Sequence, residues 1–544
     1  MAEKLTILLA QLNFHVGNIS GNLKKIEHSI HSAVNQFQAD MIVFPELAIT
    51  GYPPKDLLFH PSLATQVQEA LHVITNLSQN IAIIIGFPDY TDQHIYNAAG
   101  FFYQGQCLSI HHKQFLPNRG VFDEKRYFSS GKTANVIPFK GHQIGILICE
   151  DIWQQEPIQQ LKKQFADIVI SINASPFDYQ KLAQRQALLT DHASKHQVNI
   201  MYVQTVGGQD DLIFDGGSMA ITPQGKISHQ AILFEEALLP IQCDSGKQIM
   251  TPANHYPQPM PLEGQMLAAL TLGIKDYVSK NGFKEVVLGL SGGIDSALTL
   301  YLAVTALGAA KVHAVMMPSA FTSSMSLEDA KKLAGNLNID YQILPITDIY
   351  EQFDHTLSAA FSGQTPDTTE ENLQARIRGM LLMALSNKFG WLVLTTGNKS
   401  EMAVGYATLY GDMAGGFAVL KDVSKQMVYR LSNYCNRLQT IIPPRIITRP
   451  PSAELAHNQQ DSDNLPSYDI LDNILEAYIE HDRSRQQIIE QGFDAQLVDQ
   501  VLSLVDRNEY KRRQAPPGPR VTPRALSDDR RYPITLGFKH QSMA

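Results

Sequence analysis

Short apolar runs rich in β-branched residues recur through the first half of the chain, and they constrain its fold more than any other feature. They lie at 5–11, 41–46, 81–87, 144–150, 167–173 and 199–205. Runs of this length are typical of strands that are buried on at least one face. Amphipathic stretches such as 22–38 separate several of them, so the first half is predicted to be an α/β domain.

A proline-rich segment divides the chain. Residues 251–262 contain four prolines, a density that neither a helix nor a central strand can hold, and we interpret 246–262 as a linker. The alternation then resumes, with a helix predicted over about 263–280, a strand over 285–290, a helix over 296–308 and a strand over 312–318. Two α/β domains are therefore predicted, 1–245 and 263–544, the second a doubly wound, Rossmann-like parallel sheet.

Composition excludes several classes of function. The 44 basic and 53 acidic residues give a net charge of −9, which argues against nucleic-acid or membrane-surface binding. No apolar run approaches the ~20 residues of a membrane span, and the N-terminus resembles a first strand and not a signal peptide. Four scattered cysteines without metal-ligand spacing indicate a reduced, cytoplasmic setting.

Three polar residues in the first half suggest acyl-transfer chemistry. Glu46 closes the run 41–46, Cys149 directly follows IGILI, and Lys113 lies in the polar segment 111–128. Singly, they could be a paired carboxylate, a buried thiol and a solvated lysine. Together they supply what a thiol nucleophile needs, because a free cysteine has a pKa of ~8.5 and requires a base or a cation nearby. Glu46 could take the thiol proton and Lys113 could stabilise an oxyanion.

These motifs carry a family resemblance. FPELAITGYPPKDLL at 44–58, the lysine segment and CEDIW at 149–153 resemble, in that order, the glutaminase domain of the nitrilase superfamily. The resemblance covers about residues 1–245 and implies an αββα sandwich. It implies that Glu46 is the base, Lys113 the oxyanion stabiliser and Cys149 the nucleophile, with Glu124 as a supporting second glutamate.

The same resemblance suggests glutamine contacts. Ser175 and Lys181 match positions that hold the amino-acid end of glutamine. Related enzymes usually have tyrosine after LPN, whereas this chain has Arg119. Arg119 could bind the substrate carboxylate or point to solvent.

A glycine-rich loop opens the second domain. GLSGGIDSA at 289–297 joins a predicted strand to a predicted helix, where backbone N–H groups favour an anion. A tight turn would also explain the glycines. The loop is neither a Walker A sequence nor GxGxxG. It resembles the pyrophosphate loop of the N-type ATP pyrophosphatases, which implies that Asp295 also holds Mg²⁺ and that ATP binds the loop residues Gly289, Leu290, Ser291, Gly292, Gly293, Ile294, Asp295 and Ser296.

Further motifs point to the acceptor. A helix with a capping box from Thr368 to Glu371 is predicted after the loop, followed by TTGNKSE at 395–401 and a glycine-punctuated loop at 405–423. Over about residues 262–540 the series closely resembles the NAD synthetase family, which implies a homodimer through this domain. It also implies roles for single residues: Thr396 contacts ATP, Lys421 binds phosphates, Glu401 joins Asp295 on Mg²⁺ and contacts deamido-NAD, and Asn372 and Lys399 contact deamido-NAD.

The C-terminal segment is basic. Seven Lys or Arg residues fall between 511 and 531. Either this is a solvated tail, or it closes over anionic nucleotides, with Lys511 as a deamido-NAD contact.

The two halves predict one reaction. Glutamine hydrolysis in the first domain would release ammonia, and the second would adenylate deamido-NAD with ATP and Mg²⁺ and amidate it to NAD. An enclosed path for ammonia is expected, because ammonia in water at neutral pH is mostly protonated. One alternative is another adenylating amidotransferase, such as a GMP- or asparagine-forming enzyme. The other is that the nitrilase-like half is only structural or regulatory and that free ammonia is used.

Overall fold

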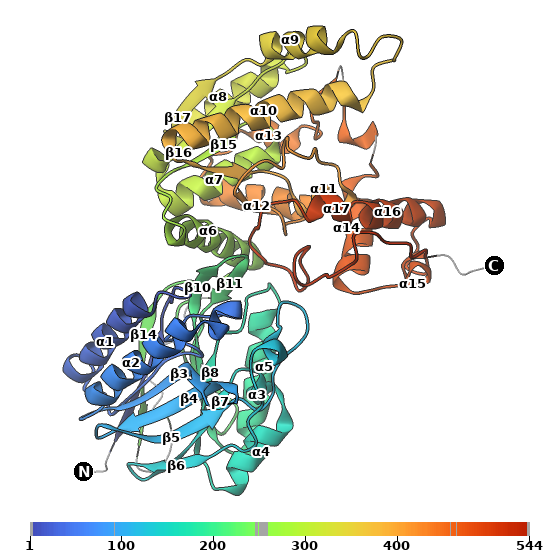
Figure 1. The fold of residues 1–544 in the computed structure, drawn as a ribbon. Coiled ribbons are helices and arrows are strands. Elements are labelled where there is room, and N and C mark those ends of the chain that lie inside the picture. The colour runs from blue at the N-terminus through green and yellow to red at the C-terminus, as the bar shows by residue number, and fades with distance from the viewer. Residues whose placement is uncertain are drawn as a thin grey trace. The chain divides into compact units, whose positions relative to one another are not determined.

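The structure is a computed structural model that describes residues 4–91, 93–244, 249, 259–456, 459–463 and 465–540. The chain divides into two compact units, 1–260 and 261–544 (Figure 1). Most of the predicted linker 246–262 lies outside the described residues.

The first unit contains two six-stranded sheets. In the first sheet the strand order is β14-β1-β2-β3-β4-β5, with β1 antiparallel to β14 and parallel to β2. Its strands are β1 (Leu5–Gln11), β2 (Met41–Val43), β3 (Ala82–Tyr90), β4 (Ile95–Tyr103), β5 (Gln106–His112) and β14 (Ala237–Cys243). The second sheet has the order β13-β12-β9-β8-β7-β6. Its strands are β6 (Val136–Phe139), β7 (His142–Ile148), β8 (Ile168–Asn173), β9 (Asn199–Gln204), β12 (Met219–Ile221) and β13 (Ile227–Gln230). A separate hairpin pairs β10 (Val206–Gln209) with β11 (Leu212–Asp215).

Three apolar clusters define four layers in this unit. One lies between the sheets and takes Ile7 and Ile84 from the first and Ile146 and Ile170 from the second. The second packs the outer face of the first sheet against α1 (Ile19–Asn35) and α2 (Pro61–Leu77). The third packs the second sheet against α4 (Gln155–Lys163) and α5 (Lys181–His196). The predicted αββα sandwich is confirmed.

The second unit is built on one parallel sheet of five strands in the order β17-β16-β15-β18-β19. The strands are β15 (Val286–Gly289), β16 (Val312–Met316), β17 (Asp340–Ile343), β18 (Leu392–Thr395) and β19 (Phe417–Ala418). The helices that accompany it are α6 (Leu262–Lys280), α7 (Ile294–Leu307), α8 (Ser324–Leu337), α9 (Thr347–Leu357), α10 (Thr368–Phe389), α11 (Lys399–Val404), α12 (Lys425–Leu438) and α13 (Pro444–Thr448). The predicted parallel α/β domain is confirmed.

A small helical subdomain completes this unit. It contains α14 (Tyr468–Leu475), a π-helical turn (Glu476–Glu480), α15 (Arg485–Ile489), α16 (Ala495–Arg507) and α17 (Glu509–Arg512). Its apolar cluster includes Leu471, Val501 and Val505 together with Met402 and Ala403 of α11. The helix that follows β18 is therefore packed into the C-terminal helices.

Two local predictions are wrong. The strand expected over 41–46 ends at Val43, so Glu46 lies in the loop that follows β2. The capping box of α10 is formed by Asp367 and Glu370, one residue before the predicted pair. The aspartate carboxylate is a stronger N-cap acceptor than the threonine hydroxyl, which explains the earlier start.

Two negative findings apply to the described part of the chain. No helix there is long and apolar enough to cross a membrane. The same residues contain no group of three or more His, Cys, Asp or Glu side chains arranged to hold a metal.

Candidate active sites

The first site forms where β7 ends. Cys149 follows Ile148 directly and precedes the single-turn helix α3 (Glu150–Trp153). Its backbone has φ 44° and ψ −97°, a conformation that L-residues rarely adopt and that costs free energy unless neighbours hold it. The Cys149 N–H donates to Ile172 O of β8 over 3.0 Å. A sharp strand-to-helix turn thus presents the thiol at the end of the sheet.

A buried charge network faces this turn. Lys113 Nζ lies 2.7 Å from Glu46 Oε1 and 2.8 Å from Glu124 Oε1. All three side chains are almost fully excluded from solvent. Charged groups are stable in such surroundings only when they are paired and hydrogen-bonded, and each of these is. The structure therefore brings together the three charged residues that the sequence predicted.

Two further donors orient the carboxylates. Asn97 Nδ2 donates to Glu46 Oε1 over 2.7 Å, and the Ala174 N–H donates to Glu46 Oε2 over 2.8 Å. The Tyr52 hydroxyl donates to Glu124 Oε1 over 2.9 Å. Sequence reasoning did not find Asn97 or Tyr52. The only available signal was a polar residue inside the apolar β4 for Asn97, and for Tyr52 its place in the motif that also contains Glu46.

The surroundings of Cys149 favour its neutral thiol. Burial raises the pKa of Cys149 well above its usual value, and the charge on Glu46 raises it further, while Lys113 opposes the shift. For Lys113, burial favours the neutral amine, but Glu124 and Glu46 outweigh it and raise the pKa well above its usual value. Burial also raises the pKa of Glu124, to about 7. Since Lys113 alone does not produce a thiolate, proton transfer to a base is needed.

Asp151 joins the segment around Lys113 to the turn at Cys149. Its buried carboxylate accepts from the backbone N–H groups of Gln114 and Phe115, both over 2.9 Å, and of Ile148 over 3.1 Å. Its Oδ2 also lies 3.2 Å from His111 Nε2. One carboxylate therefore fixes the residues on either side of Lys113 against the end of β7.

Arg119 lies at the surface beside the turn that contains Cys149. Its side chain is 82% exposed, and Nη2 lies 3.7 Å from Glu150 Oε1, on the residue after Cys149. Ser175 is buried and its N–H donates to Gln204 Oε1 over 3.2 Å. The ammonium of Lys181 lies 4.2 Å from the centre of the Trp153 ring. The predicted glutamine contacts of Arg119, Ser175 and Lys181 stay predictions.

The second site is a cavity of about 280 Å³ at the carboxyl end of β15. Seven of the eight predicted loop residues line it; Gly292 is not among them. Gly292 instead adopts φ +82°, and a Cβ there would lie 2.5 Å from Ser326 O, so only glycine fits. Ser291 Oγ lies 3.1 Å from Ser296 Oγ and accepts from the Gly293 N–H over 3.2 Å. The loop therefore presents hydroxyls and the start of α7 to the cavity.

Two carboxylates and one lysine meet in this cavity. Lys425 Nζ lies 2.6 Å from Asp295 Oδ2 and 3.2 Å from Glu401 Oε1. Asn398 Nδ2 donates to Asp295 Oδ1 over 2.9 Å. Burial raises the pKa of Glu401 to about 8, Lys425 lowers it and Asp295 raises it. Two carboxylates that converge on one cationic position suit Mg²⁺, which is commonly held by one or two carboxylates plus phosphate oxygens.

The other predicted residues lie in different surroundings. Thr396 lines the cavity, whereas Asn372, Lys399, Lys421 and Lys511 do not. Asn372 accepts from the Thr408 hydroxyl over 2.7 Å, and Lys421 Nζ donates to Pro516 O over 2.7 Å.

The two remaining lysines are also engaged inside the second unit. Lys399 pairs with Asp422 at 2.9 Å and with Glu480 at 2.6 Å. Lys511 Nζ donates to the carbonyls of Gly405 and Ala407, both over 2.8 Å. Their predicted nucleotide contacts stay predictions.

Six charged cavity residues were missed by the sequence analysis: Arg378, Asp412, Lys425, Arg449, Glu454 and Asp461. Arg378 is largely buried, and burial lowers its pKa to about 10. Arg449 donates to Gly292 O over 3.1 Å. Lys425 had a usable signal, because it is the first residue of α12, where the helix dipole disfavours a cation.

Comparison with known proteins gives consistent matches. The carbon-nitrogen hydrolase family matches residues 6–249, and the NAD synthase family matches 266–515. The glutamine-dependent NAD(+) synthetase of Acinetobacter baylyi is 48% identical, over 99% of both chains. That of Thermotoga maritima is 43% identical, also over 99% of both chains. The structure of an Acinetobacter baumannii glutamine-dependent NAD+ synthetase in complex with ADP superposes with a TM-score of 0.81 at 45% identity. That match covers 99% of this chain and all of the other.

Proposed function

This chain belongs to the glutamine-dependent NAD(+) synthetases, and on that premise we propose which of its residues perform each half of the reaction. The enzyme is a ligase that forms a carbon–nitrogen bond with glutamine as the nitrogen donor. The observation that carries the assignment of the first half is the buried Glu46–Lys113–Glu124 network beside Cys149.

Glutamine hydrolysis proceeds at the end of β7. Glu46 accepts the thiol proton of Cys149, and the sulfur attacks the side-chain amide carbon of glutamine. Lys113 stabilises the oxyanion of the tetrahedral intermediate. Protonated Glu46 then returns its proton to the amide nitrogen, the carbon–nitrogen bond breaks, and ammonia leaves while a thioester remains. Water, deprotonated by Glu46, then attacks the thioester, and glutamate leaves as the thiol is restored. Glu124 holds the Lys113 ammonium from its other side throughout.

Glutamine specificity is assigned to three residues. Ser175 and Lys181 bind the amino-acid end of the substrate, and Arg119 exchanges Glu150 for the substrate carboxylate. This assignment is supported by the exposed guanidinium of Arg119 beside the turn that contains Cys149.

Amide formation proceeds in the cavity of the second unit. The nicotinate carboxylate of deamido-NAD attacks the α-phosphorus of ATP, which gives an adenylate and pyrophosphate. Ammonia then attacks the activated carbonyl, AMP leaves and NAD is formed. The hydroxyls of Ser291 and Ser296 and the start of α7 bind the pyrophosphate. Thr396 contacts ATP.

Asp295 and Glu401 would hold Mg²⁺, which neutralises charge on the phosphates when it is bound. We assign to Lys425 the phosphate-binding role that the sequence gave to Lys421. This assignment is supported by the position of Lys425 between the two carboxylates. Asn372, Lys399, Glu401 and Lys511 stay candidates for deamido-NAD contacts.

Donor exchange tests this scheme. The purified chain is given deamido-NAD, ATP and Mg²⁺ with either glutamine or ammonium, and NAD is measured. Cys149→Ala should lose glutamine-driven synthesis and keep ammonium-driven synthesis. Cys107→Ala removes an exposed thiol from β5 and serves as the matched control. Equal loss of both activities in Cys149→Ala would contradict the division of labour, and no NAD from either donor in the wild type would contradict the proposed acceptor.

A further inference from the structure

Helix α11 connects the ATP cavity to the C-terminal segment. It has only six residues, Lys399–Val404, and a helix this short is not stable by itself. Its N-cap Asn398 donates to Asp295, and its third residue, Glu401, lies in the cavity beside Lys425. The position of Glu401 therefore depends on whatever holds this helix in place.

Three side chains from the C-terminal segment cap the end of α11. Arg512 Nη1 donates to Ala403 O over 2.5 Å and to Met402 O over 3.5 Å. Asn508 Nδ2 donates to Val404 O over 2.8 Å. Lys511 adds the bonds to the two loop carbonyls that follow. A helix leaves its last four carbonyls without intrahelical partners, and cations are favourable there, so these donors satisfy the end of α11.

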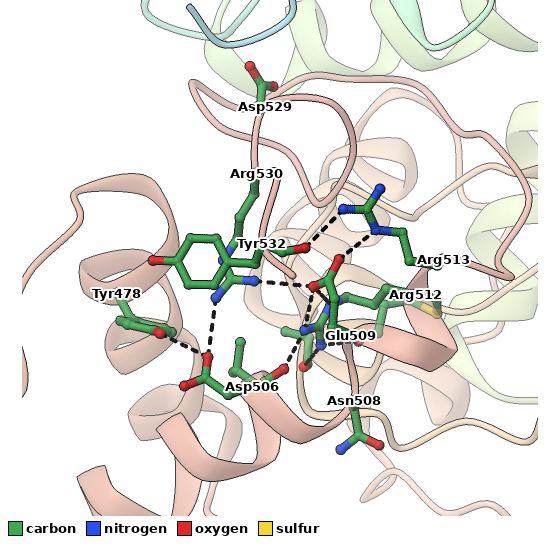
Figure 2. Close-up of polar contacts among 12 residues, drawn as sticks. Tyr478, Asp506, Asn508, Glu509, Arg512, Arg513, Asp529, Arg530 and Tyr532 are labelled. Carbon is green, nitrogen blue, oxygen red and sulfur yellow. Dashed lines mark hydrogen bonds and ion pairs between the residues drawn. The ribbon is translucent and has the colours of Figure 1, made fainter. Parts of the chain in front are cut away.

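Arg512 is itself held by a buried cluster, which Figure 2 shows. Glu509 Oε2 accepts from Arg512 Nη2 over 2.9 Å and from Nε over 3.2 Å. Arg530 reaches the same carboxylate and Asp506, each over 3.3 Å. Tyr478 OH donates to Asp506 Oδ1 over 2.9 Å. Arg512, Glu509 and Arg530 are all buried. The guanidinium is therefore fixed in direction and is not a mobile surface cation.

We propose that Arg512 is a positioning residue for the amide-forming site. It does not line the cavity; by capping α11 it fixes the direction in which Glu401 enters the cavity. The proposal rests on the assignment of Glu401 to Mg²⁺ made above. It gives part of the basic C-terminal segment a function in addition to any contact with nucleotide, because its cations order the helix that carries a carboxylate of the site.

Binding measurements test the proposal without turnover. The full chain is titrated calorimetrically with an α,β-methylene analogue of ATP at a series of Mg²⁺ concentrations, in the absence of deamido-NAD. Arg512→Gln should raise the Mg²⁺ concentration needed for half-maximal binding by about tenfold or more, as loss of partners behind a ligand does. Arg512→Lys keeps a positive charge but not the planar set of guanidinium donors. Its Mg²⁺ midpoint should therefore lie between those of the wild type and Arg512→Gln. Asn508→Leu removes a different cap and should shift the midpoint in the same direction.

Arg513→Gln is the matched control. Arg513 Nε binds the same Glu509 over 3.0 Å, and Nη2 donates to Tyr532 O, but no contact joins it to α11 among the described residues. It is 47% exposed. A wild-type Mg²⁺ midpoint in Arg512→Gln, or an equal shift in Arg513→Gln, would overturn the proposal. Loss of bound nucleotide at every Mg²⁺ concentration in both Arg512→Lys and Asn508→Leu would overturn it as well, since that pattern means lost folding. A wild-type protein that binds no ATP analogue would instead overturn the proposed function.

Discussion

Removal of one hydroxyl should move the pH dependence of glutamine hydrolysis. Tyr52 OH donates to Glu124 Oε1 over 2.9 Å in a site without solvent access, and this bond favours the ionised carboxylate. A hydrogen bond to a charged group contributes about 1.5–3 kcal/mol, and one pKa unit corresponds to about 1.4 kcal/mol. Tyr52→Phe should therefore raise the pKa of Glu124 from about 7 by roughly one to two units.

Glutamate release across pH is the assay. An ionised Glu124 anchors the Lys113 ammonium, so the wild-type rate should fall as pH drops through about 7. In Tyr52→Phe the same fall should begin roughly one to two units higher. Tyr90→Phe is the control, because its hydroxyl donates to Leu58 O, outside the charged network. A uniform loss of rate in Tyr52→Phe, with an unchanged midpoint, would refute the reasoning.

Two other predictions follow from single contacts. Lys425→Met should reduce ammonium-driven NAD formation at least tenfold more than Lys421→Met, because Lys425 lines the cavity and pairs with Asp295 and Glu401, whereas Lys421 does not line it. Equal losses would contradict the assignment. Gly131→Ala should suppress glutamine hydrolysis and spare ammonium-driven synthesis, because the new Cβ would lie 2.1 Å from His112 O; an unchanged glutaminase rate would show that the strand adjusts.

Residues at the ends of strands were the part of the first site that sequence could predict. Apolar runs marked β3, β7 and β8 to within a few residues, and Cys149 stood out because it follows one of them. Asn97 and Tyr52 could not be found in this way. Their partners lie 51 and 72 residues away in the chain, and only the folded structure brings them to the carboxylates.

In the second site, the sequence predicted the local loop but not the contacts that depend on packing. The loop at 289–296 was predictable because its glycines and its strand–helix context are local features. The position of Lys425 was not predictable, since only packing directs its side chain toward Asp295. The phosphate contact predicted for Lys421 stays a prediction. The roles of the C-terminal arginines were not predictable either. Arg512 forms an ion pair with Glu509, and Arg530 forms ion pairs with both Glu509 and Asp506. The expected homodimer stays a prediction.

The cap on α11 also has a consequence for the order in which activities arise during synthesis. Glu46, Lys113 and Cys149 all precede β14, whose pairing with β1 completes the first sheet at Cys243. The contacts that hold α11, the helix that carries Glu401, form only after Asn508, Arg512 and finally Arg530 have been synthesised. Since domains fold as units from the N-terminus during translation, a nascent chain acquires its ammonia source long before the site that consumes ammonia is held in shape. Truncation near the C-terminus would therefore leave a glutaminase that wastes its product.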